Sequence, residues 1–138
     1  MKILVDRDIP FINGVFEPYA EVVYLPGKEF APANVKDADA LVIRTRTKCN
    51  AALLDGSAVK FIATATIGMD HIDLDYCASA GIAVANAAGC NAGGVMQYVF
   101  TSLYAIACQK GILLPDGISS SPSGKKLTLG VIGVGNVG

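Results

Sequence analysis

The stretch Ala40-Leu41-Val42-Ile43-Arg44-Thr45-Arg46-Thr47-Lys48 passes from four apolar residues into a run of cations and hydroxyls. A second stretch, Phe61-Ile62-Ala63-Thr64-Ala65-Thr66-Ile67-Gly68, makes a similar change further along the chain. Apolar runs that do not alternate with polar residues are typical of parallel strands covered on both faces. The two stretches therefore predict successive buried strands, each followed by a polar loop.

Similar short apolar runs recur along the chain, with helix-like segments between them. The expected strands are residues 2–5, 21–25, 40–44, 60–64, 82–85 and 127–132. Strands that alternate with helices indicate the α/β class. We expect a flavodoxin-like doubly wound parallel sheet over residues 1–90, and the last strand to open a second domain over residues 113–138.

Two helices carry start and stop signals. Asp73 is expected to cap a helix that runs to about Ala80 and is closed by Gly81. Asn91 is expected to cap a second helix that ends before Gly111. At 1.5 Å per residue this second helix would be roughly 27 Å long. We expect residues 91–112 to connect the two domains.

The connecting helix contains seventeen successive uncharged residues, 92–108, which is near the lower limit for a membrane span. It also carries polar residues, Gln97, Thr101 and Ser102. Both flanks have an ordinary α/β pattern, which favours a helix buried between layers or domains over a membrane segment. We therefore expect no membrane partner.

Composition excludes several classes of protein. The 138 residues are 52% hydrophobic and 17% charged, which is too apolar for a disordered chain. Eleven Lys and Arg residues against twelve Asp and Glu give a net charge of −1, so no basic field is present and no nucleic-acid partner is expected. The four cysteines form no CxxC pair and the chain starts without a secretory pattern. These features indicate the cytoplasm, with the cysteines as small apolar fillers.

A glycine-rich motif follows the last expected strand. Residues 133–138 read Gly-Val-Gly-Asn-Val-Gly, which fits the G-x-G-x-x-G pattern of dinucleotide-binding loops. The first glycine of that pattern makes a tight turn, and the second lets the backbone approach a pyrophosphate. The candidate cofactor-binding residues are Gly133, Gly135, Asn136, Val137 and Gly138. The alternative is an ordinary turn in a chain with fifteen glycines.

The polar loops after the two quoted strands form a candidate ligand site. Open α/β sheets bind ligands at the carboxyl ends of their strands. If the strand geometry persists, side chains alternate, so Arg44, Arg46 and Lys48 point one way while Thr45 and Thr47 point the other. Cations, hydroxyls and the backbone amides near Gly68 suit a small acid. The alternative is that these residues are solvated strand ends.

The single histidine lies in Asp70-His71-Ile72-Asp73. Adjacent side chains rarely face each other, and no nucleophile is near in the sequence. We therefore expect His71 to belong to a helix entry rather than to act as a general acid or base. The spacing of Asp70, His71 and Asp73 matches no metal-ligand motif, and no metal ion is expected.

A resemblance to a known family rests on a combination of these features. The small α/β domain, the segment Thr66-Ile67-Gly68-Met69-Asp70-His71-Ile72-Asp73, the long helix and the final Gly-x-Gly-x-x-Gly are similar to the N-terminal part of D-2-hydroxyacid dehydrogenases. The resemblance implies a cytoplasmic, homodimeric enzyme that oxidises a small phosphorylated hydroxy acid with NAD. It also implies that residues 113–138 begin a Rossmann dinucleotide-binding domain.

The resemblance implies roles for some residues of this chain and not for others. The resemblance implies that Thr45 and Thr66 contact the substrate, and that backbone amides of Ile67 and Gly68 form a carboxylate cradle. Arg44 is added as a substrate contact from its charge and position. No catalytic residue carries over, because the Arg, Glu and His of the family lie in its later part.

The resemblance covers essentially the whole chain but only about the first third of a family member. We therefore expect the chain by itself to be inactive. Two alternatives remain open at this point. One is a dehydrogenase for another hydroxy acid, such as 3-phosphoglycerate, and the other is a non-catalytic module that binds a small ligand.

Overall fold

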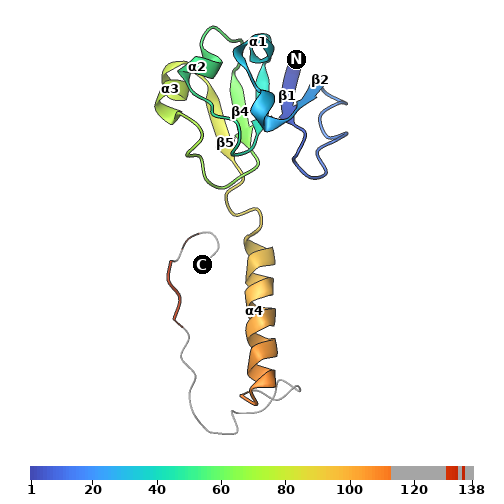
Figure 1. The fold of residues 1–138 in the computed structure, drawn as a ribbon, viewed down its shortest axis with the longest axis vertical. Coiled ribbons are helices and arrows are strands. Elements are labelled where there is room, and N and C mark those ends of the chain that lie inside the picture. Colours follow the sequence, from blue (N-terminus) through green and yellow to red (C-terminus); the bar gives the residue numbers. More distant parts are fainter. Residues whose placement is uncertain (113–129, 134, 136–138) are drawn as a thin grey trace. The chain divides into compact units, whose positions relative to one another are not determined.

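A computed structural model describes residues 1–112, 130–133 and 135 of the chain (Figure 1). The chain divides into two compact units, Met1–Ala88 and Gly89–Gly138. The first unit holds a β-sheet and the short helices around it. The second unit contains helix α4, Ala92–Gln109. The two units are described separately below.

The sheet of the first unit has five parallel strands in the order β2-β1-β3-β4-β5. The strands are β1 Lys2–Asp6, β2 Glu21–Leu25, β3 Ala40–Ile43, β4 Phe61–Thr64 and β5 Ala83–Asn86. This order is that of flavodoxin-like sheets, in which the chain changes direction between β1 and β3. The expected α/β class is confirmed, and each predicted strand of this sheet is found within one residue at either end.

One face of the sheet holds the larger core. Leu41 and Ile43 of β3 point to this face together with Ile62 of β4. Three short helices cover it: α1 Pro32–Val35, α2 Ala51–Leu54 and α3 Leu74–Ser79. The buried side chains that they supply are Val35, Leu53, Leu54 and Cys77. This packing explains why Leu41, Ile43 and Ile62, which point to this face, are apolar.

The opposite face of the sheet explains the rest of the apolar run. Ile3, Val5 and Ala40 are buried there, and residues of the connection between β1 and β2 pack against them. On β4 the same face is less covered, since Phe61, which lies between Ala40 and Ala83 in register, is 41% exposed. Both faces of β1 and β3 are therefore covered, so neither strand alternates between apolar and polar residues.

Both predicted helices are found, and Asp73 caps α3 as expected, whereas the Asn91 side chain makes no capping hydrogen bond at the start of α4. The carboxylate of Asp73 accepts a hydrogen bond from the Tyr76 amide at 2.9 Å, which satisfies a free N–H at the start of α3. Gly81, with φ of +71°, follows the end of that helix. Gly111, with φ of +66°, lies beyond the end of α4 in the same way. Among the residues that the structure describes, no helix combines the length and hydropathy that crossing a membrane requires.

The buried cysteines act as apolar fillers. Cys49 and Cys77 belong to the larger core, and both thiols are free. Burial raises the pKa of Cys49 to about 12, so this thiol stays protonated at neutral pH. A protonated, inaccessible thiol contributes packing rather than reactivity.

The strand expected over residues 127–132 is not found in the part of this segment that the structure describes. Residues 127–129 lie outside the described residues, and residues 130–132 have no strand conformation. A strand exists through hydrogen bonds to a neighbouring strand, and no described residue pairs with this segment. Apolar β-branched residues are therefore insufficient here without a pairing partner.

Candidate ligand-binding site

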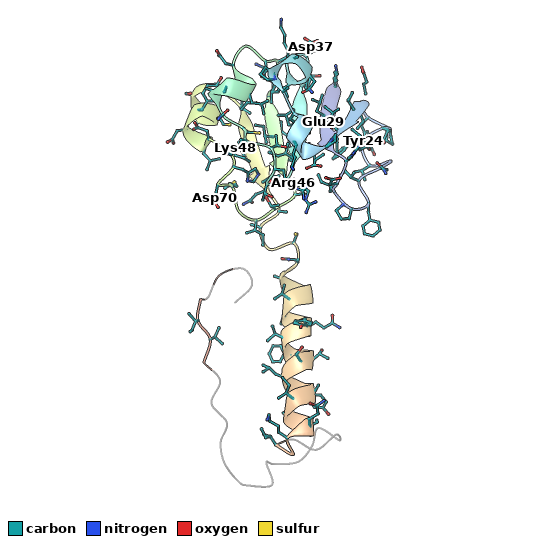
Figure 2. All side chains as sticks on the ribbon, in the orientation of Figure 1. Tyr24, Glu29, Asp37, Arg46, Lys48 and Asp70 are labelled. Atoms are coloured by element: carbon teal, nitrogen blue, oxygen red, sulfur yellow. The ribbon has the colours of Figure 1, made fainter. Side chains whose placement is uncertain are left out.

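The loops after β3 and β4 lie next to each other because Ile43 and Thr64 end paired strands in register. A hollow of about 290 Å³ lies at these loops and is lined by Thr45, Lys48, Gly68, Asp70 and His71. In Figure 2, Arg46 and Asp70 are labelled near the lower edge of the first unit. Thr45 and Gly68 thus lie together at the edge of the sheet where the sequence predicts a ligand site.

The loop after β3 departs from the predicted alternation. The strand ends at Ile43, and the Thr47 amide donates a hydrogen bond to the Arg44 carbonyl at 3.2 Å, which makes a turn. As a result Thr45 and Lys48 line the same hollow. Thr47 is buried elsewhere and donates its hydroxyl to the Gly27 carbonyl at 2.9 Å. The predicted alternation is wrong because it requires an extended backbone, which the turn interrupts.

Arg44 lies apart from the hollow. Its Nη1 donates to the Asp8 carbonyl at 3.0 Å, in the loop after β1. Arg46 Nη1 is 3.7 Å from the Asp8 carboxylate. Both arginines therefore tie the loop after β3 to the loop after β1, at the place where the sheet changes direction. Arg44 remains a candidate substrate contact only from its charge and position.

The two loops that form the hollow are held together by backbone hydrogen bonds. The Cys49 amide donates to the His71 carbonyl, and the Asp73 amide donates to the Cys49 carbonyl, both at 2.8 Å. These bonds form a short parallel bridge between Cys49 and Ile72. The bridge fixes His71 beside the end of β4, although no local sequence pattern predicts this position for His71.

Three side chains at the end of β4 form a hydrogen-bonded chain. The hydroxyls of Thr64 and Thr66 are 2.7 Å apart, and His71 Nε2 is 3.1 Å from the Thr64 hydroxyl. The Thr66 hydroxyl also donates to the Gly68 carbonyl at 3.1 Å. Sequence reasoning missed His71 as part of the site. The sequence predicts the contact between Thr64 and Thr66, since residues two apart at a strand end share one side of the strand. It contains no signal that brings His71 to them.

The ionisation of His71 depends on two opposing influences. Partial burial lowers the pKa of His71 below its usual value, and the neighbouring Asp70 carboxylate raises it by a smaller amount. The imidazole is therefore neutral at pH 7 and carries a proton on one nitrogen only.

Other polar groups of the site are free to bind a ligand. In the described part of the chain, neither the Thr45 hydroxyl nor the amides of Ile67 and Gly68 take part in a hydrogen bond. The Ile67 carbonyl accepts from the Asn86 side chain at 2.8 Å, which anchors this loop to the end of β5. Lys48 supplies a positive charge at the same hollow. One hydroxyl, two amides and one ammonium group suit an anionic oxygen of a ligand, whereas the Asp70 carboxylate in the same lining suits a hydrogen-bond donor.

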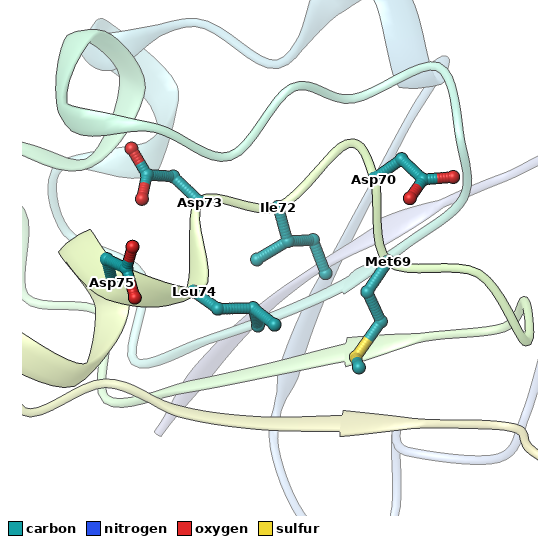
Figure 3. Close-up of a pocket in the computed structure, with 6 residues that line it drawn as sticks. All are labelled: Met69, Asp70, Ile72, Asp73, Leu74 and Asp75. Atoms are coloured by element: carbon teal, nitrogen blue, oxygen red, sulfur yellow. The ribbon is translucent and has the colours of Figure 1, made fainter.

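A second hollow, of about 560 Å³, lies beside α3 and is lined by Met69, Asp70, Ile72, Asp73, Leu74 and Asp75. Figure 3 shows the Asp70 carboxylate at the opposite side from those of Asp73 and Asp75. Asp73 already accepts the capping hydrogen bond from Tyr76. Within residues 1–112, 130–133 and 135, no three His, Cys, Asp or Glu side chains gather as metal ligands would.

Part of the glycine-rich motif is described. Gly133 has φ of +90°, which fits a glycine that makes a tight turn. Among the described residues, no heavy atom lies within 4 Å of a Cβ built on Gly133 or on Gly135, so these residues leave the backbone open to an approaching group. Asn136, Val137 and Gly138 lie outside the described residues.

A parallel α/β sheet with a hollow at its strand ends that carries a few polar groups is the arrangement with which many α/β enzymes bind small ligands. Comparison with protein families makes the class specific. Residues 14–114 match the family described as "D-isomer specific 2-hydroxyacid dehydrogenase, catalytic domain". The chain belongs to this family.

Individual relatives match over the whole chain. It is 54% identical to erythronate-4-phosphate dehydrogenase of Bacteroides thetaiotaomicron and covers 37% of that protein's length. It is 51% identical to the Bacteroides fragilis protein of the same name, again covering 37% of its length. Among solved structures, an NAD⁺-bound 3-phosphoglycerate dehydrogenase from Entamoeba histolytica matches 73% of this chain and 37% of its own length, with 32% identity and a TM-score of 0.59. The chain thus spans little more than a third of the relatives that it matches.

Proposed function

We propose that this chain is the substrate-binding part of an NAD-dependent dehydrogenase that oxidises the 2-hydroxyl of 4-phospho-D-erythronate. The observation that carries the proposal is the hollow that brings Thr45, Lys48 and Gly68 together. Identity of 51–54% over the whole chain to proteins named erythronate-4-phosphate dehydrogenase supports the choice of substrate. From the resemblance we further propose a cytoplasmic homodimer that serves pyridoxal 5′-phosphate biosynthesis.

The chemistry of the hollow assigns roles to its groups. The Lys48 ammonium and the Thr45 hydroxyl bind an anionic group of the substrate by charge-assisted hydrogen bonds. The amides of Ile67 and Gly68 cradle a carboxylate, and Thr66 contacts the substrate from the end of β4. These groups hold the substrate in one orientation, which is the main contribution that a binding domain makes to a reaction between two molecules.

The residues of the glycine-rich motif that the structure describes fit a dinucleotide. Gly133 supplies the positive φ and Gly135 the open backbone for an approaching pyrophosphate. Asn136, Val137 and Gly138 complete the proposed loop. NAD supplies the acceptor for the hydride that leaves the carbon bearing the substrate hydroxyl.

Ligand binding tests the assignment of Lys48. In calorimetric titrations of the purified chain with 4-phospho-D-erythronate, Lys48→Met is expected to weaken affinity about 10-fold, because a charge-assisted hydrogen bond is lost. The matched control is Lys36→Met, since Lys36 is also exposed but precedes β3 at the opposite end of the strand. Equal affinities of wild type and Lys48→Met would contradict the assignment. Tighter binding of 3-phosphoglycerate than of 4-phospho-D-erythronate would favour the dehydrogenase of another hydroxy acid.

The purified 138-residue chain is expected to show no NAD-dependent oxidation of 4-phospho-D-erythronate. The family resemblance assigns the catalytic Arg, Glu and His to a later part of the protein, and the single histidine, His71, matches none of them. The measurement is NADH absorbance with the purified chain and, in parallel, with the complete product of its reading frame. The complete product is expected to be active. Substrate-dependent NADH formation by the 138-residue chain would contradict the prediction of inactivity.

A further inference from the structure

The hydrogen-bonded chain at the end of β4 has a definite direction. A carbonyl oxygen can only accept, so the single hydroxyl proton of Thr66 is used in its bond to the Gly68 carbonyl. Thr66 must then accept in its 2.7 Å contact with Thr64. That contact uses the single hydroxyl proton of Thr64.

The same reasoning extends to His71. Since Thr64 has donated its proton to Thr66, it can only accept in its 3.1 Å contact with His71 Nε2. The proton of the neutral imidazole is therefore on Nε2. Only this arrangement satisfies all three contacts at once, with protons directed from His71 through Thr64 and Thr66 to the Gly68 carbonyl.

This direction determines what Thr66 can recognise. Its proton is used and one lone pair is occupied by Thr64, so one lone pair is left for a ligand. A lone pair binds a donor such as a hydroxyl group, and it repels a carboxylate or phosphate oxygen. Thr45, in contrast, retains a hydroxyl proton that no described residue accepts, and it lies in the same hollow as Lys48.

We propose that His71 and Thr64 are positioning residues that hold Thr66 as a hydrogen-bond acceptor, so that Thr66 recognises a hydroxyl group of the ligand. The anionic group is then left to Lys48, Thr45 and the free amides. The inference rests on the proposed function, since it takes the hollow to be the ligand site and extends that site to Thr66, whose hydroxyl bonds to the carbonyl of the hollow-lining Gly68. Its new content is the selection of a hydroxylated acid over an acid without the hydroxyl.

The direction of the hydrogen bonds is tested without any ligand. His71 is the only histidine of the 138-residue chain, so its two ring nitrogens can be observed by ¹H–¹⁵N NMR without overlap. At neutral pH we expect a protonated Nε2 and an unprotonated Nδ1. Thr64→Val is expected to reduce this preference to that of a free histidine side chain, whereas Thr64→Ser is expected to keep it because serine retains the hydroxyl. A protonated Nδ1 in the wild type would overturn the proposal.

Recognition is tested with two probes, 4-phospho-D-erythronate and 4-phosphonooxybutanoate, which lacks both hydroxyls. Thr64→Val is expected to weaken binding of the first about 3- to 10-fold, the effect of one hydrogen bond, and to leave binding of the second unchanged. A purely structural role of Thr64 would weaken both equally, and that result would overturn the proposal.

A second pair of variants covers the case in which Thr64→Val does not fold. His71→Phe removes the donor while keeping a ring, and His71→Gln offers an amide donor in its place. We expect loss of hydroxyl selectivity in the first and its rescue in the second. If the wild type binds neither probe, the proposed function and the ligand part of this inference fail together, while the protonated nitrogen of His71 still decides the hydrogen-bond direction.

Discussion

Replacement of Ile62 by alanine is expected to lower the free energy of unfolding by about 2–5 kcal/mol, which is the largest effect among the substitutions considered. Ile62 is 0% exposed and lies on β4, between Leu41 and Val84 in register. Its side chain belongs to the core that the three short helices cover. Truncation leaves a cavity that rigid neighbouring strands cannot fill.

Urea unfolding followed by far-UV circular dichroism measures this loss. Ile62→Val should cost about 0.5–1.5 kcal/mol, because only one methyl group is removed. Phe61→Ala is the control on the opposite face, where the side chain is 41% exposed and has less contact area to lose. If Phe61→Ala destabilised the protein more than Ile62→Ala, the larger core would not be the one on the helix-covered face.

Gly27→Ala is expected to destabilise the first unit by about 1–3 kcal/mol through overpacking. A Cβ at this position would lie 2.7 Å from Asp6 Oδ2 and 3.3 Å from the Thr47 hydroxyl. Neither neighbour moves freely, because Asp6 Oδ1 accepts from the Asp8 amide at 3.0 Å and Thr47 donates to the Gly27 carbonyl at 2.9 Å. Glycine is required here by close packing of the loops after β1, β2 and β3.

The same substitution should weaken ligand binding, since Thr47 is two residues from Thr45 in the loop that lines the hollow. Gly94→Ala is the matched control. A Cβ there meets no atom of a described residue within 4 Å, and Gly94 lies inside α4, so stability should be unchanged or increase by about 0.5–1 kcal/mol. Both variants are compared by thermal unfolding. A neutral Gly27→Ala variant would show that the Asp6 side chain can move aside.

Much of the fold follows from local patterns. Unbroken apolar runs such as Leu41-Val42-Ile43 predict strands covered on both faces, and Asp73 and Gly81 predict the ends of α3. Each of these signals acts between residues close in sequence: a side chain caps a nearby amide, and a glycine adopts a positive φ. Such features can be predicted without knowing which segments pack against each other.

The candidate site was only partly predictable. The sequence predicts Thr45, Thr66 and Gly68 as candidates because residues after parallel strands gather at one edge of the sheet, and the structure places Thr45 and Gly68 in one hollow there. The orientation of Thr45 was missed because a turn at Arg44 ends the alternation. The expected strand over residues 127–132 shows the same limit, since its pairing depends on residues that its own sequence does not specify.

The sequence by itself determined the α/β class, the positions of the five strands of the sheet, the cap of α3 and the edge of the sheet at which polar groups collect. Only the tertiary structure decided that His71 bonds to Thr64 and that Lys48 shares a hollow with Thr45. The physical reason is that these contacts depend on how two loops return to each other through the Cys49–Ile72 bridge. Local propensity sets each segment, whereas the direction of a side chain in a loop is set by contacts between segments.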